Sequence, residues 1–352
     1  MYRKGLVGIM AFLVPVFVYA GGIVPHIRLN KSVYLVGEPI WVTSWVTNET
    51  DTTIRIMREF IENLYIVNSK GDRATRRGVH FTKVALPPYE EIWEIGPLKS
   101  SSIWIHDITE FYGYGSERAA MGGWFQSFSP DEYTVKYTVT SIPEIWQKNL
   151  WIFAVKNARE LLELKKKYGY KQEDEGKGWH KRERYASEPV KFTVIRPTGE
   201  EKKVYELMLS AHDVKKPYET LRRYEHILNN YPNSAYAEVA FYEIIGVYET
   251  RFYWKAPQVP VEILRRKCYE FLERYPNSYF GIRVVSTIAN MCGFSMEEKI
   301  VELERIGKKY KTEHIQYAVK KELKEQKEKL EQIKKGTYIG PEGPRYPRRK
   351  KE

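Results

Sequence analysis

The residues of this chain that could do chemistry are scattered and form no recognised catalytic arrangement. Its seven histidines, at positions 26, 80, 106, 180, 212, 226 and 314, lack the spacing of metal ligands. His106, beside Asp107 at the end of a predicted strand, is the most notable of them, but without further partners we expect a structural histidine. The motifs of serine hydrolases, zinc proteases, phosphate loops and dinucleotide sites are absent. The sequence therefore predicts no enzyme activity, no cofactor and no metal.

Three neighbouring carboxylates offer a second possible chemistry. Glu90, Glu91 and Glu94 could act as paired acids in glycoside hydrolysis. The alternation around them instead favours the outer face of a short strand, with Ile92 and Ile95 pointing inward.

Aromatic residues are abundant, with nine Trp and 27 Tyr, and flat aromatic faces can stack on sugars. Most of them fall on predicted apolar faces and so belong to the core. Trp124, Trp179, Tyr253 and Trp254 remain as candidate exposed contacts to a partner. Trp124 ends a glycine-rich stretch, residues 113–124, that is either a ligand-contact loop or a flexible connection.

The only two cysteines, Cys268 and Cys292, fall on consecutive predicted antiparallel helices. Their distances from the intervening turn differ by about six residues, roughly 9 Å along the helix axis. A disulfide does not tolerate that offset, so we expect two buried free thiols.

The first half of the chain shows the period-two alternation of a β domain. Strands are predicted near 27–31, 33–36, 41–46, 54–56, 64–67, 79–85, 102–106, 133–140 and 190–195. In one of them Tyr133, Val135, Tyr137 and Val139 share a face. Apolar residues at helical spacing after Pro143 predict a helical insert near 143–167.

Two segments of this half carry a family resemblance. The run from Lys31 to Ile40, with Tyr34, Gly37 and Glu38, resembles the opening of bacterial immunoglobulin-like and macroglobulin-like domains. The run Pro130 to Val135 is similar to the start of a late strand in those domains, with Asp131 replacing their usual Gly. The resemblance implies an immunoglobulin-like β-sandwich and leaves its strand order open.

The second half repeats itself. Tyr231-Pro232-Asn233-Ser234 is echoed by Tyr275-Pro276-Asn277-Ser278, and a fainter third copy ends at Tyr310. The tyrosines are 44 and then 35 residues apart, and the second spacing is close to the tetratricopeptide period. Proline ends one helix and Asn or Ser caps the next, so each tetrapeptide predicts a corner between antiparallel helices.

About residues 200–312 resemble the tetratricopeptide family, especially variants in bacterial envelope proteins, although the Trp-Leu-Gly signature is missing. The resemblance implies a stack of helix pairs, and a charged last helix near 313–335 is expected to cap it.

The start of the chain indicates export. Arg3 and Lys4 precede an apolar run from Leu6, and Val18-Tyr19-Ala20 supplies the small residues of a cleavage site. Residues 1–22 are therefore a signal peptide or, because the apolar run continues to Val24, an uncleaved N-terminal anchor. We expect a periplasmic or extracellular protein, or one held at the membrane by that segment alone.

The net charge of +12 favours anionic partners in general, but the densest basic run lies in the last residues after several Gly and Pro. We interpret residues 336–352 as a solvated disordered tail, so nucleic acid is not an expected partner.

The predicted fold class is therefore all-β plus all-α: residues 23–198 form an immunoglobulin-like β-sandwich with a helical insertion, and residues 199–335 form a tetratricopeptide-like α-solenoid. The expected function is a non-enzymatic scaffold that binds a protein or peptide through its helical repeats. The alternative is a carbohydrate-binding accessory protein that holds a glycan through the β domain.

Overall fold

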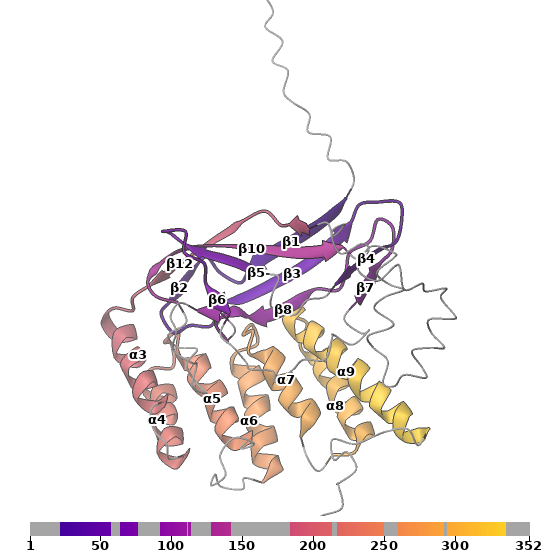
Figure 1. Ribbon diagram of the computed structural model, residues 1–352. Coiled ribbons are helices and arrows are strands. Elements are labelled where there is room, and N and C mark those ends of the chain that lie inside the picture. Colours follow the sequence, from indigo (N-terminus) through magenta and orange to yellow (C-terminus); the bar gives the residue numbers. More distant parts are fainter. Residues whose placement is uncertain are drawn as a thin grey trace, which may run out of the picture.

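A computed structural model describes residues 22–57, 64–76, 92–110, 112–113, 128–141, 184–212, 217–249, 260–291 and 294–335. Its strands lie between Ile23 and Ile195, and the helices that follow lie between Gly199 and Lys334. The two parts pack together, with the helices side by side beneath the sheets (Figure 1). The two-part fold class is thus confirmed. The signal segment before residue 22, the insert at 143–167 and the tail at 336–352 lie outside the described residues and stay predictions.

The β domain contains two main sheets. The first has the order β1-β3-β8 and the second contains β2, β12, β10 and β5 as successive neighbours. The far end of β10 also pairs with β11 and with β4, which pairs with β7, and β6 pairs with β9. The bounds are β1 Ile23–Leu29, β2 Val33–Leu35, β3 Trp41–Asn48, β4 Ile54–Met57, β5 Leu64–Asn68, β6 Thr75–Arg76, β7 Ile92–Ile95, β8 Trp104–Asp107, β9 Tyr112–Gly113, β10 Asp131–Ser141, β11 Arg184–Ala186 and β12 Val190–Ile195.

The strand order is that of an immunoglobulin-like sandwich. β1, β3 and β8 correspond to strands A, B and E, while β12, β10 and β5 correspond to G, F and C. β2 runs parallel to the last strand β12, as a short second part of strand A would. The Oη of Tyr133, near the start of β10, donates to the backbone oxygen of Ser129 at 2.7 Å. This is the tyrosine corner of such domains, so the structure supplies the order that the sequence left open.

The sandwich core follows the predicted alternation. Tyr133, Val135, Tyr137 and Val139 of β10 are all buried on one face. Phe192 of β12 stacks on Tyr133, with ring centroids 5.1 Å apart. The core lies between the two sheets because each contributes alternate side chains to it.

Seven long helices are present in the described part of the chain: α3 Gly199–His212, α4 Pro217–Asn230, α5 Ala237–Glu249, α6 Val261–Arg274, α7 Gly281–Asn290, α8 Met296–Lys309 and α9 Glu313–Lys334. Each packs on the next in sequence, and α9 packs on both α7 and α8. Ser295 begins α8 with a capping box: its side chain accepts a hydrogen bond from the backbone N–H of Glu298, and the Glu298 side chain accepts one from the backbone N–H of Ser295. No helix of the described segments is long and apolar enough to span a bilayer.

The two repeated tetrapeptides occupy the same backbone setting, as predicted. The N–H groups of Tyr231 and Tyr275 each donate to the carbonyl four residues earlier, at 2.8 Å in both cases. Ser234 Oγ and Ser278 Oγ each accept from the backbone N–H two residues later, at 3.2 Å in both cases. The corners α4–α5 and α6–α7 are therefore copies of one another.

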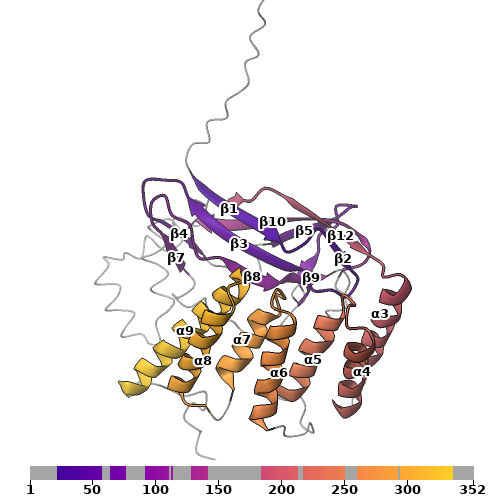
Figure 2. The same ribbon diagram turned by 180° about the vertical axis from the view of Figure 1, so that it is seen from behind.

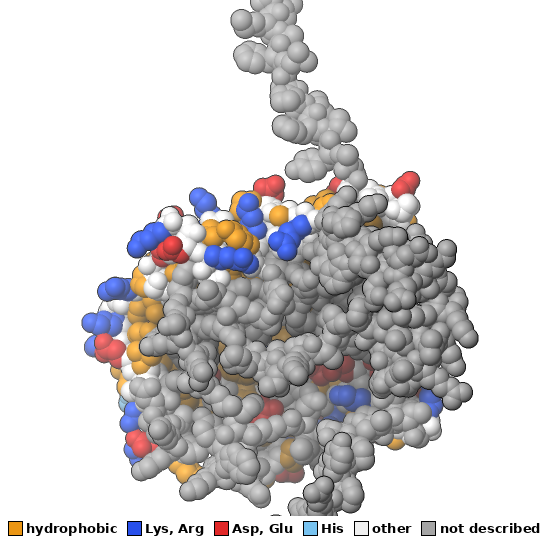
Figure 3. Space-filling view, in the orientation of Figure 1, with side chains coloured by type: hydrophobic (Ala, Val, Ile, Leu, Met, Phe, Trp, Pro, Cys, Tyr) orange, Lys and Arg blue, Asp and Glu red, His pale blue; other side chains and the backbone are white. Residues whose placement is uncertain are grey.

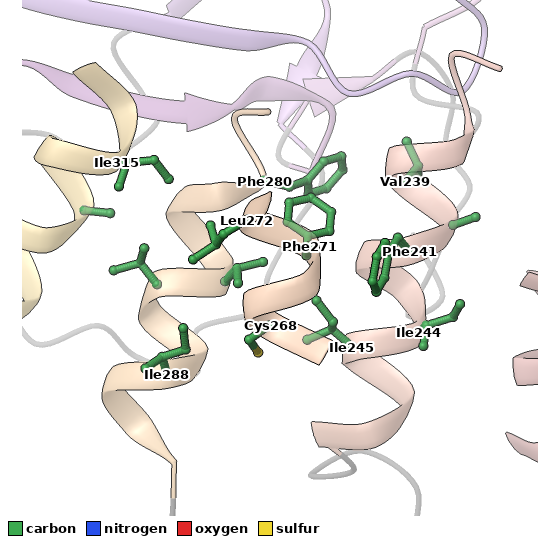
Figure 4. Packing of buried hydrophobic residues seen from close by; sticks show 14 of the residues in the cluster. Val239, Phe241, Ile244, Ile245, Cys268, Phe271, Leu272, Phe280, Ile288 and Ile315 are labelled. Carbon is green, nitrogen blue, oxygen red and sulfur yellow. The ribbon is translucent and has the colours of Figure 1, made fainter. Parts of the chain in front are cut away.

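The 44-residue offset between these corners also sets the register of the preceding helices. It places Tyr224 of α4 at the position of Cys268 of α6, and both side chains are buried. The sequence pattern alone matches Tyr224 approximately with Tyr269, which the structure places one position further around the helix. Cys268 is a free buried thiol, as expected, and lies among the helices with Phe271 and Ile245 (Figure 4). Cys292 lies outside the described residues.

The helical corners contact the β domain directly (Figure 2). Tyr236 Oη donates to the backbone oxygen of Val36 at 2.6 Å, and the equivalent residue Phe280 meets the Trp41 ring edge-on, at a centroid distance of 5.6 Å. Arg283 lies over the Trp41 ring and forms an ion pair with Asp107 at 3.4 Å. Alternation in the strand predicted near 41–46 indicates burial of one face, whereas both faces of β3 are buried because the second packs on the helices.

Candidate partner-binding cleft

His106 and Asp107 do not form a catalytic pair. Adjacent residues of a strand point to opposite faces, so His106 faces the sandwich interior while Asp107 reaches Arg283 on the helical side. His106 is buried, and neither ring nitrogen has a hydrogen-bond partner in the described structure. Burial lowers the pKa of His106 to about 3, which makes it a neutral core residue, as expected from the sequence.

The other candidate acids and metal ligands also form no site within the described segments. Glu94 is exposed on β7, and Glu90 and Glu91 lie outside those segments. No group of three or more His, Cys, Asp or Glu side chains is placed to hold a metal ion in the part of the chain that the structure covers.

The structure does not test the four aromatic residues predicted as partner contacts. Trp124, Trp179, Tyr253 and Trp254 all lie outside the described residues, so their role stays a prediction.

A cleft opens between α6 and α8, which are the first helices of two successive helix pairs. Its volume is about 480 Å³. Four cationic side chains, two carboxylates, two tyrosines and one isoleucine line it: Arg265, Arg266, Arg305, Lys309, Glu262, Glu273, Tyr269, Tyr310 and Ile306. The cleft exists because α6 and α8 are each packed on the second helices of the pairs, α7 and α9, rather than closely on one another.

Glu302, which is largely buried beside the cleft, organises its centre. One of its oxygens, Oε1, accepts from Arg265 at 2.8 and 3.1 Å, from Arg305 at 2.9 Å and from the Tyr269 hydroxyl. The two guanidinium groups and the phenol therefore converge on one carboxylate oxygen from two helices.

The titration of these groups follows from that geometry. Burial acts to raise the pKa of Glu302, but the hydrogen bonds from Tyr269 and Arg265 outweigh it, so its pKa lies below the usual value. Burial and the bond to Glu302 both raise the pKa of Tyr269. Glu302 is therefore charged and Tyr269 neutral at neutral pH, and the two arginines stay fixed around the carboxylate.

The rim of the cleft is held less tightly. Lys309 pairs with Glu273 at 2.6 Å, but both side chains are exposed and such a pair contributes little stability. Arg266 is exposed and forms no ion pair with a described residue. These groups are free to exchange their contacts for those of a partner, while the arginines around Glu302 are fixed in place.

Sequence reasoning missed this cleft. Arg265, Glu302 and Arg305 lie on the polar faces of two predicted helices, like many other charged residues of the chain. Nothing in their spacing distinguishes them, because Arg265 and Glu302 are 37 residues apart and meet only through the packing of the helix pairs.

Comparison with known proteins adds one structural similarity. No model of a protein family matches the sequence, and no curated protein matches it. The chain is similar to a solved structure, the ASH / PapD-like domain 7 of human CEP192, at 10% sequence identity and a TM-score of 0.23. The match covers 56% of this chain and 99% of that one. So low a TM-score carries no argument, and the immunoglobulin-like assignment rests on the strand order and on the Tyr133 corner.

Proposed function

We propose that this protein is an exported, non-enzymatic scaffold whose α6–α8 cleft binds an extended segment of a protein or peptide partner. The observation that carries the proposal is the cleft itself: an open groove between two first helices, with a fixed polar centre and exchangeable rim charges. Helical repeats bind in this way because successive units expose equivalent side chains along one surface.

The helix pairs are best interpreted as tetratricopeptide-like units. The repeated corners at Ser234 and Ser278 support this, as does the 35-residue spacing from Tyr275 to Tyr310, which ends α8 with the same backbone hydrogen bond. Export, to the periplasm or the cell exterior, is supported by the charged and apolar pattern of the N-terminal residues.

Site-specific crosslinking in the full-length chain tests the proposal. A photoreactive amino acid at Arg266 or at Lys309 is exposed to extract from the source cells, with Lys320 on α9 as the exposed control position. We expect the same discrete adduct from both cleft positions and none from Lys320. The Arg305→Glu change, introduced into the Lys309-labelled chain, should abolish the adduct. It also removes the ion pair with Glu302, so thermal unfolding must show that the variant is still folded at the labelling temperature.

Adducts formed equally from all three positions, or adducts that persist in the Arg305→Glu chain, would show that the cleft is not the binding site.

A further inference from the structure

The outer face of the second sheet is a separate surface with its own composition. Since Tyr133, Val135 and Tyr137 of β10 point into the core, their neighbours Thr134 and Lys136 point outward. The pairing then assigns the outward side chains of the adjoining strands, because paired residues share a face. We call the resulting surface the basic sheet face. Its outward side chains include the cations Arg73, Lys136, Arg184 and Lys191, the polar Glu132 and Thr134, and the apolar Val33, Leu35, Tyr65, Val67 and Ile195.

Positive charge dominates this face. Lys136, Arg184, Lys191 and Arg73 point outward from it, against the single carboxylate of Glu132. None of the four cations forms an ion pair with a described residue. This differs from the helices, where many exposed Lys and Arg side chains pair with Glu.

Apolar side chains lie between these cations: Tyr65 and Val67 on β5, and Val33 and Leu35 beside Ile195 at the β2 edge. Val33, Tyr65 and Ile195 are 48%, 42% and 42% exposed, and they are three of the seven exposed large apolar side chains in the described segments. Arg73 lies over the ring of Tyr65, 5.0 Å from its centroid. Figure 3 shows Lys and Arg side chains around an apolar area over the strands β10 and β12.

The orientation of the face follows from the packing of the domain. The first sheet has its outer face against the helices, where Trp41 and Ile105 belong to the helical core. The basic sheet face therefore points away from the α6–α8 cleft and, except at its β2 edge, where Leu35 packs against the helical core, away from the helices (Figure 1).

We propose that the basic sheet face binds an anionic phospholipid surface. Spaced cations that form no ion pair with a described residue can pair with headgroup phosphates, and each contributes about fivefold in affinity close to an anionic surface. Tyrosine and isolated aliphatic side chains suit the interfacial layer of a bilayer. A tight protein partner would instead require a packed cluster of large anchor side chains at the centre of the surface. The central position here is Thr134, and its paired neighbours are Lys191 and Val67, of which only Val67 is apolar.

Vesicle sedimentation of the full-length chain tests this proposal. The quantity measured is the ratio of partition coefficients for phosphatidylglycerol-containing and pure phosphatidylcholine vesicles, because any contribution of the N-terminal apolar segment is common to both. Changing Lys136→Gln together with Lys191→Gln should lower this ratio about thirtyfold, at about fivefold for each lost cation. In 0.5 M salt the ratio of the unaltered chain should approach one, since screening then acts within about 4 Å.

The matched control is Lys308→Gln with Lys320→Gln, which removes the same charge from exposed, unpaired positions on α8 and α9. It should change the ratio by less than about threefold, because these cations lie off the proposed face. Equal losses in the two double variants would attribute the binding to net charge and overturn the proposal. The proposal would also be overturned if the chain showed no preference for anionic vesicles but bound soluble polyglutamate and lost that binding on Lys136→Gln with Lys191→Gln. That result would identify an acidic polypeptide as the ligand.

Discussion

Trp41 is the residue at which the dependence of the two domains on each other can be measured. It lies on β3 but belongs to the helical core, is 4% exposed, and contacts Phe280, Tyr279 and Arg283. Truncating a buried tryptophan to alanine costs about 3–5 kcal/mol. We expect Trp41→Ala to lower the free energy of unfolding by about 4 kcal/mol, measured by chemical denaturation.

A double-mutant cycle with Phe280→Leu shows whether that loss comes from the interface. The edge-on contact of the two rings predicts a coupling energy of about 0.5–1.5 kcal/mol. Val42→Ala is the matched control, because Val42 is the next residue of β3 and is fully buried on the opposite face, in the sandwich core. Its coupling to Phe280→Leu should be zero within about 0.3 kcal/mol. A Trp41–Phe280 coupling no larger than that of Val42 would refute a direct energetic contact between β3 and the helical corner.

Three further predictions concern single side chains. Ser234→Ala and Ser278→Ala should each cost at least about 1 kcal/mol in chemical denaturation, because both remove the same corner hydrogen bond and a second bond to a carboxylate, that of Glu201 or of Glu238; a loss from only one of the two changes would contradict the equivalence of the corners. In a Cys292→Ser background, Cys268 should not react with a thiol reagent at pH 8 until the protein unfolds, since burial raises its pKa and excludes the reagent; rapid labelling of the native protein would argue against a buried thiol. Because burial lowers the pKa of His106 from 6.5 to about 3, its contribution to stability is complete above pH 6.5 and is lost as the pH falls toward 3, by at most about 1.4 kcal/mol per pH unit. His106→Gln should flatten that part of the stability profile, and an unchanged slope would mean that His106 is not buried in the neutral form.

Local patterns were sufficient to predict much of this fold. The alternation of Tyr133, Val135 and Tyr137 predicts a half-buried strand from sequence because its period of two is a property of the extended backbone. The corner at Ser278 is equally readable, because Pro276 and the Ser side chain act on backbone groups only a few residues away.

Contacts between distant segments have no such local pattern in the sequence. Trp41 looks like any other apolar residue of β3, and its partner Phe280 is 239 residues further along the chain. The alternation identifies both faces of β3 but cannot show that a helical corner covers the second. The cluster around Glu302 was missed for the same reason. In the sequence, Arg265 and Arg305 look like ordinary helix-surface cations, and they meet Glu302 only when the helices pack.

A position next to the corner shows how a distant contact modifies a repeat. Gly281 is equivalent to Ala237 of the preceding unit, 44 residues earlier, and both begin the second helix of a pair. A Cβ atom at Gly281 would overlap the end of the Ile315 side chain of α9, so an alanine here would require that side chain to move. The repeat therefore departs from its own pattern where the last helix packs against it.

The interface at Trp41 links the two proposals physically. The cleft is built on α6 and α8, and the corner that follows α6 supplies Tyr279, Phe280 and the start of α7 to the β domain. A partner bound in the cleft would thus be held at a fixed orientation to the basic sheet face on the opposite side of the sandwich. If both surfaces are used, the folded Trp41→Ala variant should still bind the peptide and should still bind vesicles, when each is measured on its own. The same variant should nevertheless broaden the distribution of distances between a spin label on α8 and one on β12. An unchanged distance distribution would show that other contacts, such as Tyr236 with Val36, are enough to fix the two domains.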